Sequence, residues 1–108
     1  MMKWKSIKAG TLIKIKNQEG GIIRVGKNYY DEKEIFYNYI LILSNVEFKD
    51  HKRSRKRKFY FKAAFYNDFT EKVHVDDFDR SMMRSGMKMI QDEKMAQKIQ
   101  EACFFEGL

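Results

Sequence analysis

The sequence predicts a mainly β (α+β) fold, a small SH3-like or related antiparallel barrel of about five strands with a C-terminal helix. Aromatic residues, which favour strands, make up 15% of the 108 residues. Short stretches of alternating or continuous apolar residues recur through the first part of the chain, whereas the tail changes to three- and four-residue apolar spacing. We therefore expect one domain, 1–108, with a β-barrel over 1–75 and a helical closing segment over 76–108.

The first predicted unit is a hairpin. Residues 11–16 alternate between isoleucines on one face and lysines on the other, which predicts a half-buried strand with a basic outer face. Residues 17–21 form a polar turn ending in two glycines, which tolerate positive φ. Residues 22–25 are apolar again and predict the returning strand.

The middle of the chain predicts three further strands. The stretch Ile35–Phe48 is apolar in both phases, which is typical of a central strand covered on both faces. Ser44 and Asn45 indicate a bulge or bend within it. Phe59–Tyr66 alternates, with phenylalanines on one face, and Thr70–Val75 predicts a last strand with its valines inward.

The tail predicts helical structure. We expect a short helix or turn near Asp77–Arg84 and a longer helix over roughly Lys88–Phe105. Methionines at helical spacing in this region are interpreted as core filler, with a promiscuous binding surface as the alternative. Cys103 is the only cysteine, so it forms no internal disulfide, and its apolar neighbours indicate a buried structural thiol.

The strongest functional signal is a basic run at residues 51–58, between two predicted strands. Six of its eight residues are Lys or Arg and none is acidic. Cations that neutralise phosphates release condensed counterions, the main source of sequence-independent affinity for nucleic acids. Basic residues of the first hairpin extend this patch if the barrel brings them round. The predicted nucleic-acid-binding residues are Lys52, Arg53, Arg55, Lys56, Arg57, Lys58, Lys14, Lys16, Arg24, Lys27 and Tyr60.

Tyrosines beside these cations are candidate platforms for stacking unpaired bases, since a tyrosine ring tolerates a half-wet site. The alternative is that each packs beneath a loop. The candidates are Tyr29, Tyr30, Tyr60 and Tyr66. For the basic run itself, the alternatives are contact with an acidic protein and a solvated loop that only aids solubility.

No cofactor, metal site or catalytic residue is predicted. The chain has no phosphate-binding glycine loop and no Cys/His zinc spacing. Its one acid–histidine cluster comprises His74, Asp76, Asp77 and Asp79. Carboxylates grouped in this way could hold Mg²⁺, but the preferred interpretation is that one aspartate caps the following helix.

The N-terminus lacks the apolar segment of a signal peptide, and the longest aliphatic run, residues 40–43, is too short to span a bilayer. We therefore expect a soluble cytoplasmic protein without a membrane partner. The sequence does not distinguish RNA from DNA and does not indicate an oligomeric state.

Three segments resemble the MazF/PemK-type toxin family. Residues 10–16 (Gly-Thr-Leu-Ile-Lys-Ile-Lys) are similar to its opening strand and residues 39–45 (Tyr-Ile-Leu-Ile-Leu-Ser-Asn) to its central strand, while residues 73–108 resemble its closing strand and helix. The resemblance implies an SH3-like barrel that acts as a metal-independent ribonuclease or binds other macromolecules through the same face. The family's Arg-Pro pair is replaced here by Asn38-Tyr39, and Thr70 is the nearest candidate for its catalytic hydroxyl.

Three functions follow from these observations. The preferred one is a non-enzymatic nucleic-acid-binding barrel that contacts phosphates with a basic hairpin tip. The second is a protein-directed inhibitor or adaptor that occupies the nucleic-acid-binding groove or an acidic patch of a larger partner. The third is a ribonuclease toxin. The first two need the same cations, so the sequence does not separate direct binding from binding to a nucleic-acid-binding protein.

Overall fold

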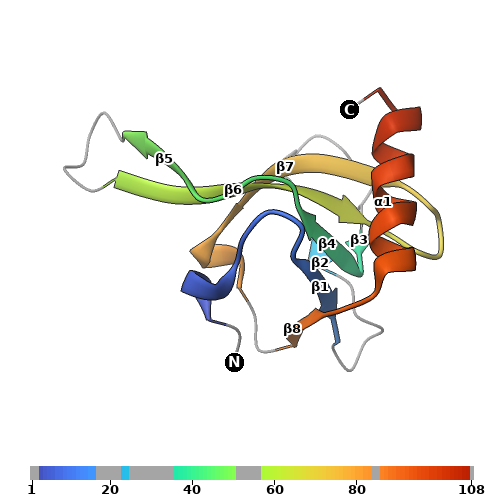
Figure 1. Ribbon diagram of the computed structural model, residues 1–108, viewed down its shortest axis with the longest axis horizontal. Coiled ribbons are helices and arrows are strands. Elements are labelled where there is room, and N and C mark those ends of the chain that lie inside the picture. Colours follow the sequence, from blue (N-terminus) through green and yellow to red (C-terminus); the bar gives the residue numbers. More distant parts are fainter. Residues whose placement is uncertain (1–2, 17–22, 25–35, 51–56, 84–85, 108) are drawn as a thin grey trace.

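Apolar stretches of the chain form an antiparallel sheet with one long helix against it, as Figure 1 shows for the computed structural model. The structure describes residues 3–16, 23–24, 36–50, 57–83 and 86–107. Its strands are β1 (Leu12–Ile15), β2 (Ile23–Arg24), β3 (Phe36–Tyr37), β4 (Tyr39–Ile42), β5 (Glu47–Asp50), β6 (Arg57–Tyr66), β7 (Val73–Asp79) and β8 (Met87–Ile90). Its helices are the 3₁₀ turns η1 (Trp4–Ser6) and η2 (Arg80–Met82) and the α-helix α1 (Glu93–Phe105).

The longest strand, β6, organises the main sheet. Strand β7 pairs with β6 along residues 60–66, so β4 and β5 share the other edge of β6. Strand β1 then pairs with β4, and β8 pairs with β1. All of these pairs are antiparallel, which confirms the predicted fold class.

A bend separates β4 from β5. Ile42 pairs with Ala63, and Glu47 pairs with Tyr60. The chain therefore takes five residue steps from Ile42 to Glu47 but only three from Tyr60 to Ala63. Two extra residues thus lie between β4 and β5. The Leu43 amide donates to the Lys62 carbonyl at 2.7 Å, and the Lys62 amide donates to the Ser44 hydroxyl at 3.0 Å. The predicted bend at residues 44–45 is confirmed, and it redirects the hairpin beyond the sheet.

The first predicted hairpin is wrong. Strand β1 pairs with β4 and β8, whereas β2 pairs with β3 in a separate two-stranded sheet. The predicted strand over 35–48 is also divided, because Asn38 interrupts it between β3 and β4. Asn38 is only 8% exposed, and its side-chain oxygen accepts a hydrogen bond from the Asp68 amide at 3.0 Å. Local alternation could not reveal these long-range pairings.

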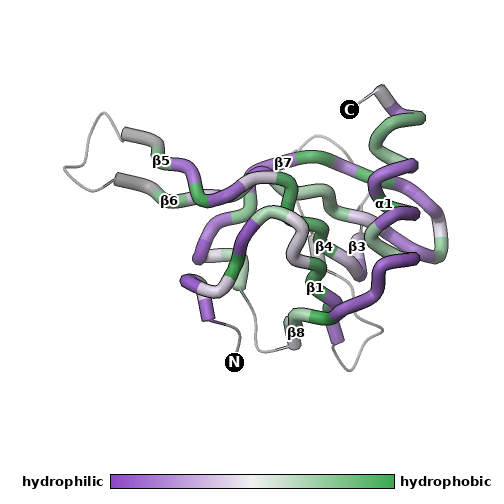
Figure 2. Tube along the Cα trace, viewed as in Figure 1, coloured by the Kyte–Doolittle hydropathy of each residue, from purple (hydrophilic) through white to green (hydrophobic). Residues whose placement is uncertain are grey.

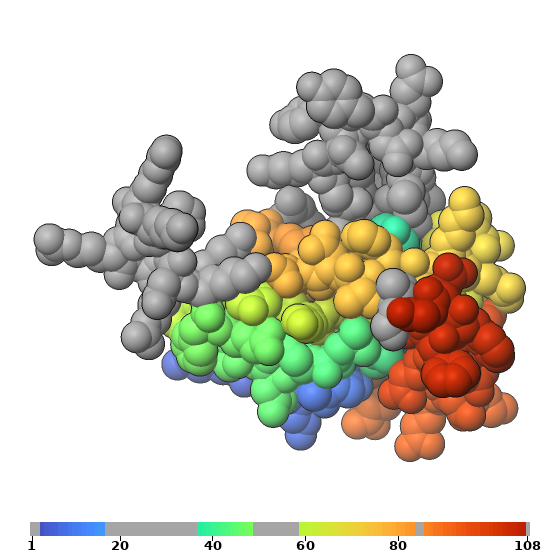
Figure 3. All heavy atoms as spheres, turned by 90° about the horizontal axis from the view of Figure 1, so that it is seen from above, coloured from blue at the N-terminus to red at the C-terminus, as the bar shows by residue number. Residues whose placement is uncertain are grey.

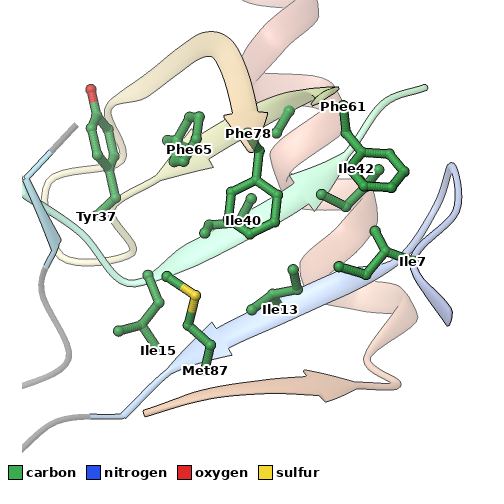
Figure 4. Close-up of a cluster of buried hydrophobic side chains, with 11 residues drawn as sticks. Ile7, Ile13, Ile15, Tyr37, Ile40, Ile42, Phe61, Phe65, Phe78 and Met87 are labelled. Carbon is green, nitrogen blue, oxygen red and sulfur yellow. The ribbon is translucent and has the colours of Figure 1, made fainter. Parts of the chain in front are cut away.

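The concave side of the sheet holds the main core. Figure 4 shows Ile13 and Ile40 from the middle of the sheet facing the rings of Phe65 and Phe78. These four side chains are fully buried, and Trp4 packs against the edge of the same cluster. The two isoleucines predicted to point inward on β1, Ile13 and Ile15, are both buried.

The convex side is covered by α1. The helix begins after Asp92, whose carboxylate accepts a hydrogen bond from the Met95 amide at 3.0 Å. It buries Ile99 and Cys103 against a second cluster that includes Leu12 and Leu41. Figure 2 shows hydrophilic residues in the first turns of the helix, outside this contact. The prediction that Cys103 is buried is confirmed, and burial raises the pKa of its thiol.

The tail differs from its prediction at two points. Strand β7 continues through Phe78 to Asp79, where a helix or turn was expected from Asp77, and only η2 follows it. Residues 87–90 form β8, so α1 begins at Glu93 and not near Lys88. Strands therefore continue past residue 75, the predicted end of the barrel segment. Backbone pairing with β1 overrides the helical spacing expected for the tail as a whole.

Figure 3 shows α1 and β5 at opposite ends of the described surface, with the loop between β6 and β7 beside the helix. In that loop Asp68 accepts a hydrogen bond from the Lys98 ammonium at 3.0 Å. Among the described residues, no helix has the length and apolar character needed to cross a membrane.

Candidate nucleic-acid interface

Strands β5 and β6 form an arm that extends past the rest of the sheet (Figure 1). The last pair between β6 and β7 joins Tyr60 to Asp79, whereas β5 pairs with β6 as far as Asp50 and Arg57. Beyond Tyr60, β6 therefore has β5 as its only strand partner among the described residues. We refer to residues 47–60 as the arm. Residues 51–56 connect its two strands.

Most of the predicted basic site lies outside the described side chains. Arg57 and Lys58 belong to the arm by their backbone, and Arg24 belongs to β2 in the same sense. The remaining predicted residues of the basic run, and one from the first hairpin, lie outside the described residues. These are Lys52, Arg53, Arg55, Lys56 and Lys27.

The lysines of β1 are not brought to the arm. Lys14 pairs with Tyr39, which pairs with Tyr66 at the end of β6 opposite the arm. Lys58 and Tyr66 are eight residue steps apart along β6, which is roughly 26 Å at about 3.3 Å per residue. Lys14 is half-buried, with its ammonium 5.7 Å from the centre of the Tyr39 ring, and Lys16 is exposed after the end of β1. Both lysines therefore belong to the part of the sheet near the Tyr66 end of β6, away from the arm.

The tyrosines predicted to stack on bases also lie in different environments. Tyr66 is 1% exposed in the second core cluster, so it offers no stacking surface. Tyr60 is half-buried and pairs with Glu47 and Asp79 on either side. Alternation along β6 directs Tyr60 to the face opposite Phe59 and Phe61. Tyr29 and Tyr30 lie outside the described residues.

The inner face of the arm forms one wall of a cleft of about 640 Å³. The arm and its base contribute rings and a valine, and the N-terminal segment contributes further apolar side chains. Phe48 and Phe59 are 55% and 45% exposed, so both rings face open space. The apolar lining consists of Trp4, Ile7, Val46, Phe48, Phe59 and Phe61.

Ring contacts hold this lining together. Phe48 and Phe59 meet edge to face across the arm, with centroids 4.8 Å apart. Trp4 makes the same kind of contact with Phe61, also at 4.8 Å, and stacks on Phe78 at 6.2 Å. Edge-to-face pairs are favourable because the positive edge of one ring meets the negative face of the other. The cleft thus continues the main core outward along the arm.

The polar lining of the cleft comes from the N-terminal segment and from η2. Lys5 and Arg80 both line it and are exposed. Asp79 also lines it, and one of its carboxylate oxygens accepts hydrogen bonds from the amide and the hydroxyl of Ser81. This confirms the expected capping role for an aspartate of the acid–histidine cluster, since Asp79 caps η2.

The other members of that cluster lie along β7. His74 and Asp76 approach within 3.5 Å, and both are exposed. The His74 ring stacks on Tyr37 at 6.3 Å. Burial raises the pKa of the Tyr37 phenol to about 12, and the negative charge of Asp76 adds to the rise. The described residues contain no group of three His, Cys, Asp or Glu side chains arranged to hold a metal ion.

Sequence reasoning missed the cleft because it treated the arm only as a support for charge. A signal was nevertheless present. Along the sequence, Phe48 and Phe59 are separated from the centre of residues 51–56 by the same number of residues. A hairpin that closes symmetrically around that segment therefore places them opposite each other. The participation of Trp4 and Arg80 has no comparable signal, since both reach the cleft through tertiary packing.

Comparison of the chain with protein-family models, with curated proteins and with solved structures gives no match. The residues of this chain therefore carry the functional proposal.

Proposed function

We propose that this protein binds nucleic acid without transforming it, using the cations of residues 51–58 to contact phosphates. One observation carries the proposal. The run contains six Lys or Arg and no acid, and it joins two strands that are paired up to Asp50 and Arg57. Cations at such density attract a polyanion, and their contact with its phosphates releases the counterions condensed on it.

The distribution of charge supports a localised contact. The residues on both sides of the run are mixed in sign: residues 31–50 hold five acids and two cations, and residues 63–79 hold five acids and one cation. A polyanion is repelled by those segments and attracted to the run. The arm therefore provides a directed contact, unlike a uniformly basic surface.

The ribonuclease alternative gains no support from the described geometry. Thr70, the hydroxyl suggested by the toxin-family resemblance, lies in the loop before β7. Arg80 is the only arginine whose side chain the structure describes, and it follows the other end of that strand. The seven residues of β7 separate the two by roughly 20 Å of extended chain. An arginine and a hydroxyl that act on one phosphodiester need to lie within contact of the same phosphate.

The test measures binding of the whole protein to labelled single-stranded and duplex RNA and DNA across a salt series. With about five phosphate contacts, log K should fall against log salt with a slope of roughly −3.5 for single strands and −4.5 for duplexes. The arm variant carries Arg53→Ser, Arg55→Ser and Arg57→Ser. Non-specific affinities spread over several contacts correspond to about 0.5–1 kcal/mol each, so its affinity should fall more than tenfold.

A charge-matched control carries Lys72→Ser, Lys88→Ser and Lys94→Ser. All three lysines are exposed and lie outside the arm and the cleft. Both variants lower the formal net charge from +7 by three, to +4, so a general charge effect would weaken them equally. Equal losses, or an arm variant that binds like the parent protein, would place the contact elsewhere. If the parent protein fails to bind at low salt, the proposal is wrong, and a stoichiometric protein partner from nuclease-treated lysate would favour the inhibitor.

A further inference from the structure

The cleft beneath the arm has a chemistry that phosphate contacts alone do not explain. We propose that it binds an unpaired base of a nucleic-acid strand whose phosphates contact the arm, which makes single strands the preferred ligand. This inference rests on the nucleic-acid binding proposed above, and it adds a second site that reads a different part of the ligand.

The aromatic rings of the cleft are exposed to a ligand. Phe48 and Phe59 remain about half exposed although Trp4 and Phe61 stand beside them in the same cleft. A contiguous apolar surface of this kind is typical of a binding site. Its volume of about 640 Å³ falls within the roughly 300–1,000 Å³ usual for small-molecule sites, which is enough for a base with its sugar.

The cleft is lined largely by flat aromatic rings. The lining joins rings from the arm with the Trp4 ring from the N-terminal segment, so a flat group in the cleft meets aromatic surfaces from two segments. Every nucleobase presents such a flat face, and stacking on protein aromatics tolerates any base sequence.

The cleft also carries positive charge. Lys5 and Arg80 line the cleft from two different segments, and the basic run at residues 51–58 belongs to the arm. The carboxylate of Asp79 is engaged by Ser81 at the start of η2. An occupant that complements both the rings and these cations must join a flat apolar ring to an anionic chain. A single nucleic-acid strand has this composition, whereas an acidic peptide lacks regularly spaced rings.

The availability of base faces distinguishes single strands from duplexes as ligands of the cleft. In a duplex each base is stacked and paired, so its face is unavailable to Trp4 or Phe59. Single strands present unstacked bases that can turn toward aromatic side chains. The arm alone would bind both forms through their phosphates, and the cleft would add affinity for the single strand only.

Trp4 makes the test direct because it is the only tryptophan in the chain. The whole protein is titrated with a thymidine oligonucleotide, with a duplex of equal length and with inorganic polyphosphate, while tryptophan emission is recorded. Polyphosphate supplies anions without bases. We expect the single strand to quench Trp4 and the polyphosphate to bind without quenching.

Substitutions then locate the site. Phe48→Ala and Phe59→Ala should each weaken single-strand binding about 5- to 150-fold, the equivalent of one lost stacking contact. Phe69→Ala removes an equally large ring that is 80% exposed in the loop after β6, so it should change nothing. Unchanged affinity of a cleft variant for polyphosphate shows that its arm is intact, and Phe48→Leu provides a milder second variant.

The outcomes separate this inference from the one it rests on. If single strands, duplexes and polyphosphate bind alike and the cleft variants keep their affinity, the cleft does not bind a base, while the arm remains a phosphate-binding site. Equal quenching by polyphosphate and oligonucleotide would also overturn the base site. If neither oligonucleotide nor duplex binds at any salt concentration, the proposed function fails and the base site fails with it.

Discussion

The Phe48 and Phe59 rings meet edge to face with their centroids 4.8 Å apart, one residue beyond the last pair that β6 makes with β7. At this position the sheet narrows to the two strands of the arm. A two-stranded ribbon is marginally stable in water, so cross-strand side-chain contacts decide whether it persists. This ring pair therefore links the stability of the arm to the open cleft.

The coupling between these rings can be measured with a double-mutant cycle. Phe48→Ala and Phe59→Ala, alone and combined, should give an interaction energy of about 0.5–1.5 kcal/mol, because the edge-to-face contact is lost in either single variant. Denaturant unfolding provides the measurement. A cycle between Phe48 and Phe69, at opposite ends of the sheet, should be additive within about 0.5 kcal/mol. Additivity in both cycles would show that the rings do not stabilise the arm.

Phe78 tests the extension of β7. Its ring is 0% exposed in the main core and stacks on Trp4, so Phe78→Ala should lower the free energy of unfolding by about 3–5 kcal/mol. Phe69→Ala, the matched substitution of an 80% exposed ring, should stay within about 0.5 kcal/mol. Similar values for the two variants would contradict the described position of β7.

Asn38 tests the break between β3 and β4. Asn38→Ala removes the acceptor of the Asp68 amide at a position only 8% exposed, so it should cost about 1–3 kcal/mol of unfolding free energy. Asn45→Ala removes a comparable bond from the Ala9 amide at an exposed site, where water replaces the acceptor. Its cost should therefore be smaller. A larger cost at Asn45 would argue that the bend, and not Asn38, is the critical junction.

Tyr37 predicts a loss of stability at alkaline pH. Its folded pKa is raised to about 12 from a usual value of 10.0, so the unfolded chain loses this proton first. Stability is therefore fully present below pH 10 and decreases as pH rises toward 12. Tyr37→Phe should reduce this decrease in melting temperature while leaving the neutral value nearly unchanged. An identical alkaline profile in the variant would show that Tyr37 does not carry the effect.

The central features of the fold could be predicted because they depend on local pattern. The alternation in 59–66 predicts a strand with Phe61 and Phe65 inward, and the polar pair at 44–45 predicts the bend. The end of the last helix at Phe105 also follows from its apolar spacing. Each of these features is decided by which faces of one segment must leave water.

The pairing of strands and the composition of the cleft could not be predicted in this way. Whether β1 pairs with β2 or with β4 and β8 depends on partners that lie far away in sequence, and Met87 and Met89 adopt a strand only because β1 offers an open edge. Trp4, Phe59 and Arg80 meet because the core brings three distant segments together. The sequence by itself determined the strands at 12–15 and 59–66, the closing helix and the concentration of charge at 51–58. The tertiary structure decided which rings stand beside that charge, because packing and backbone pairing are satisfied only between segments remote along the chain.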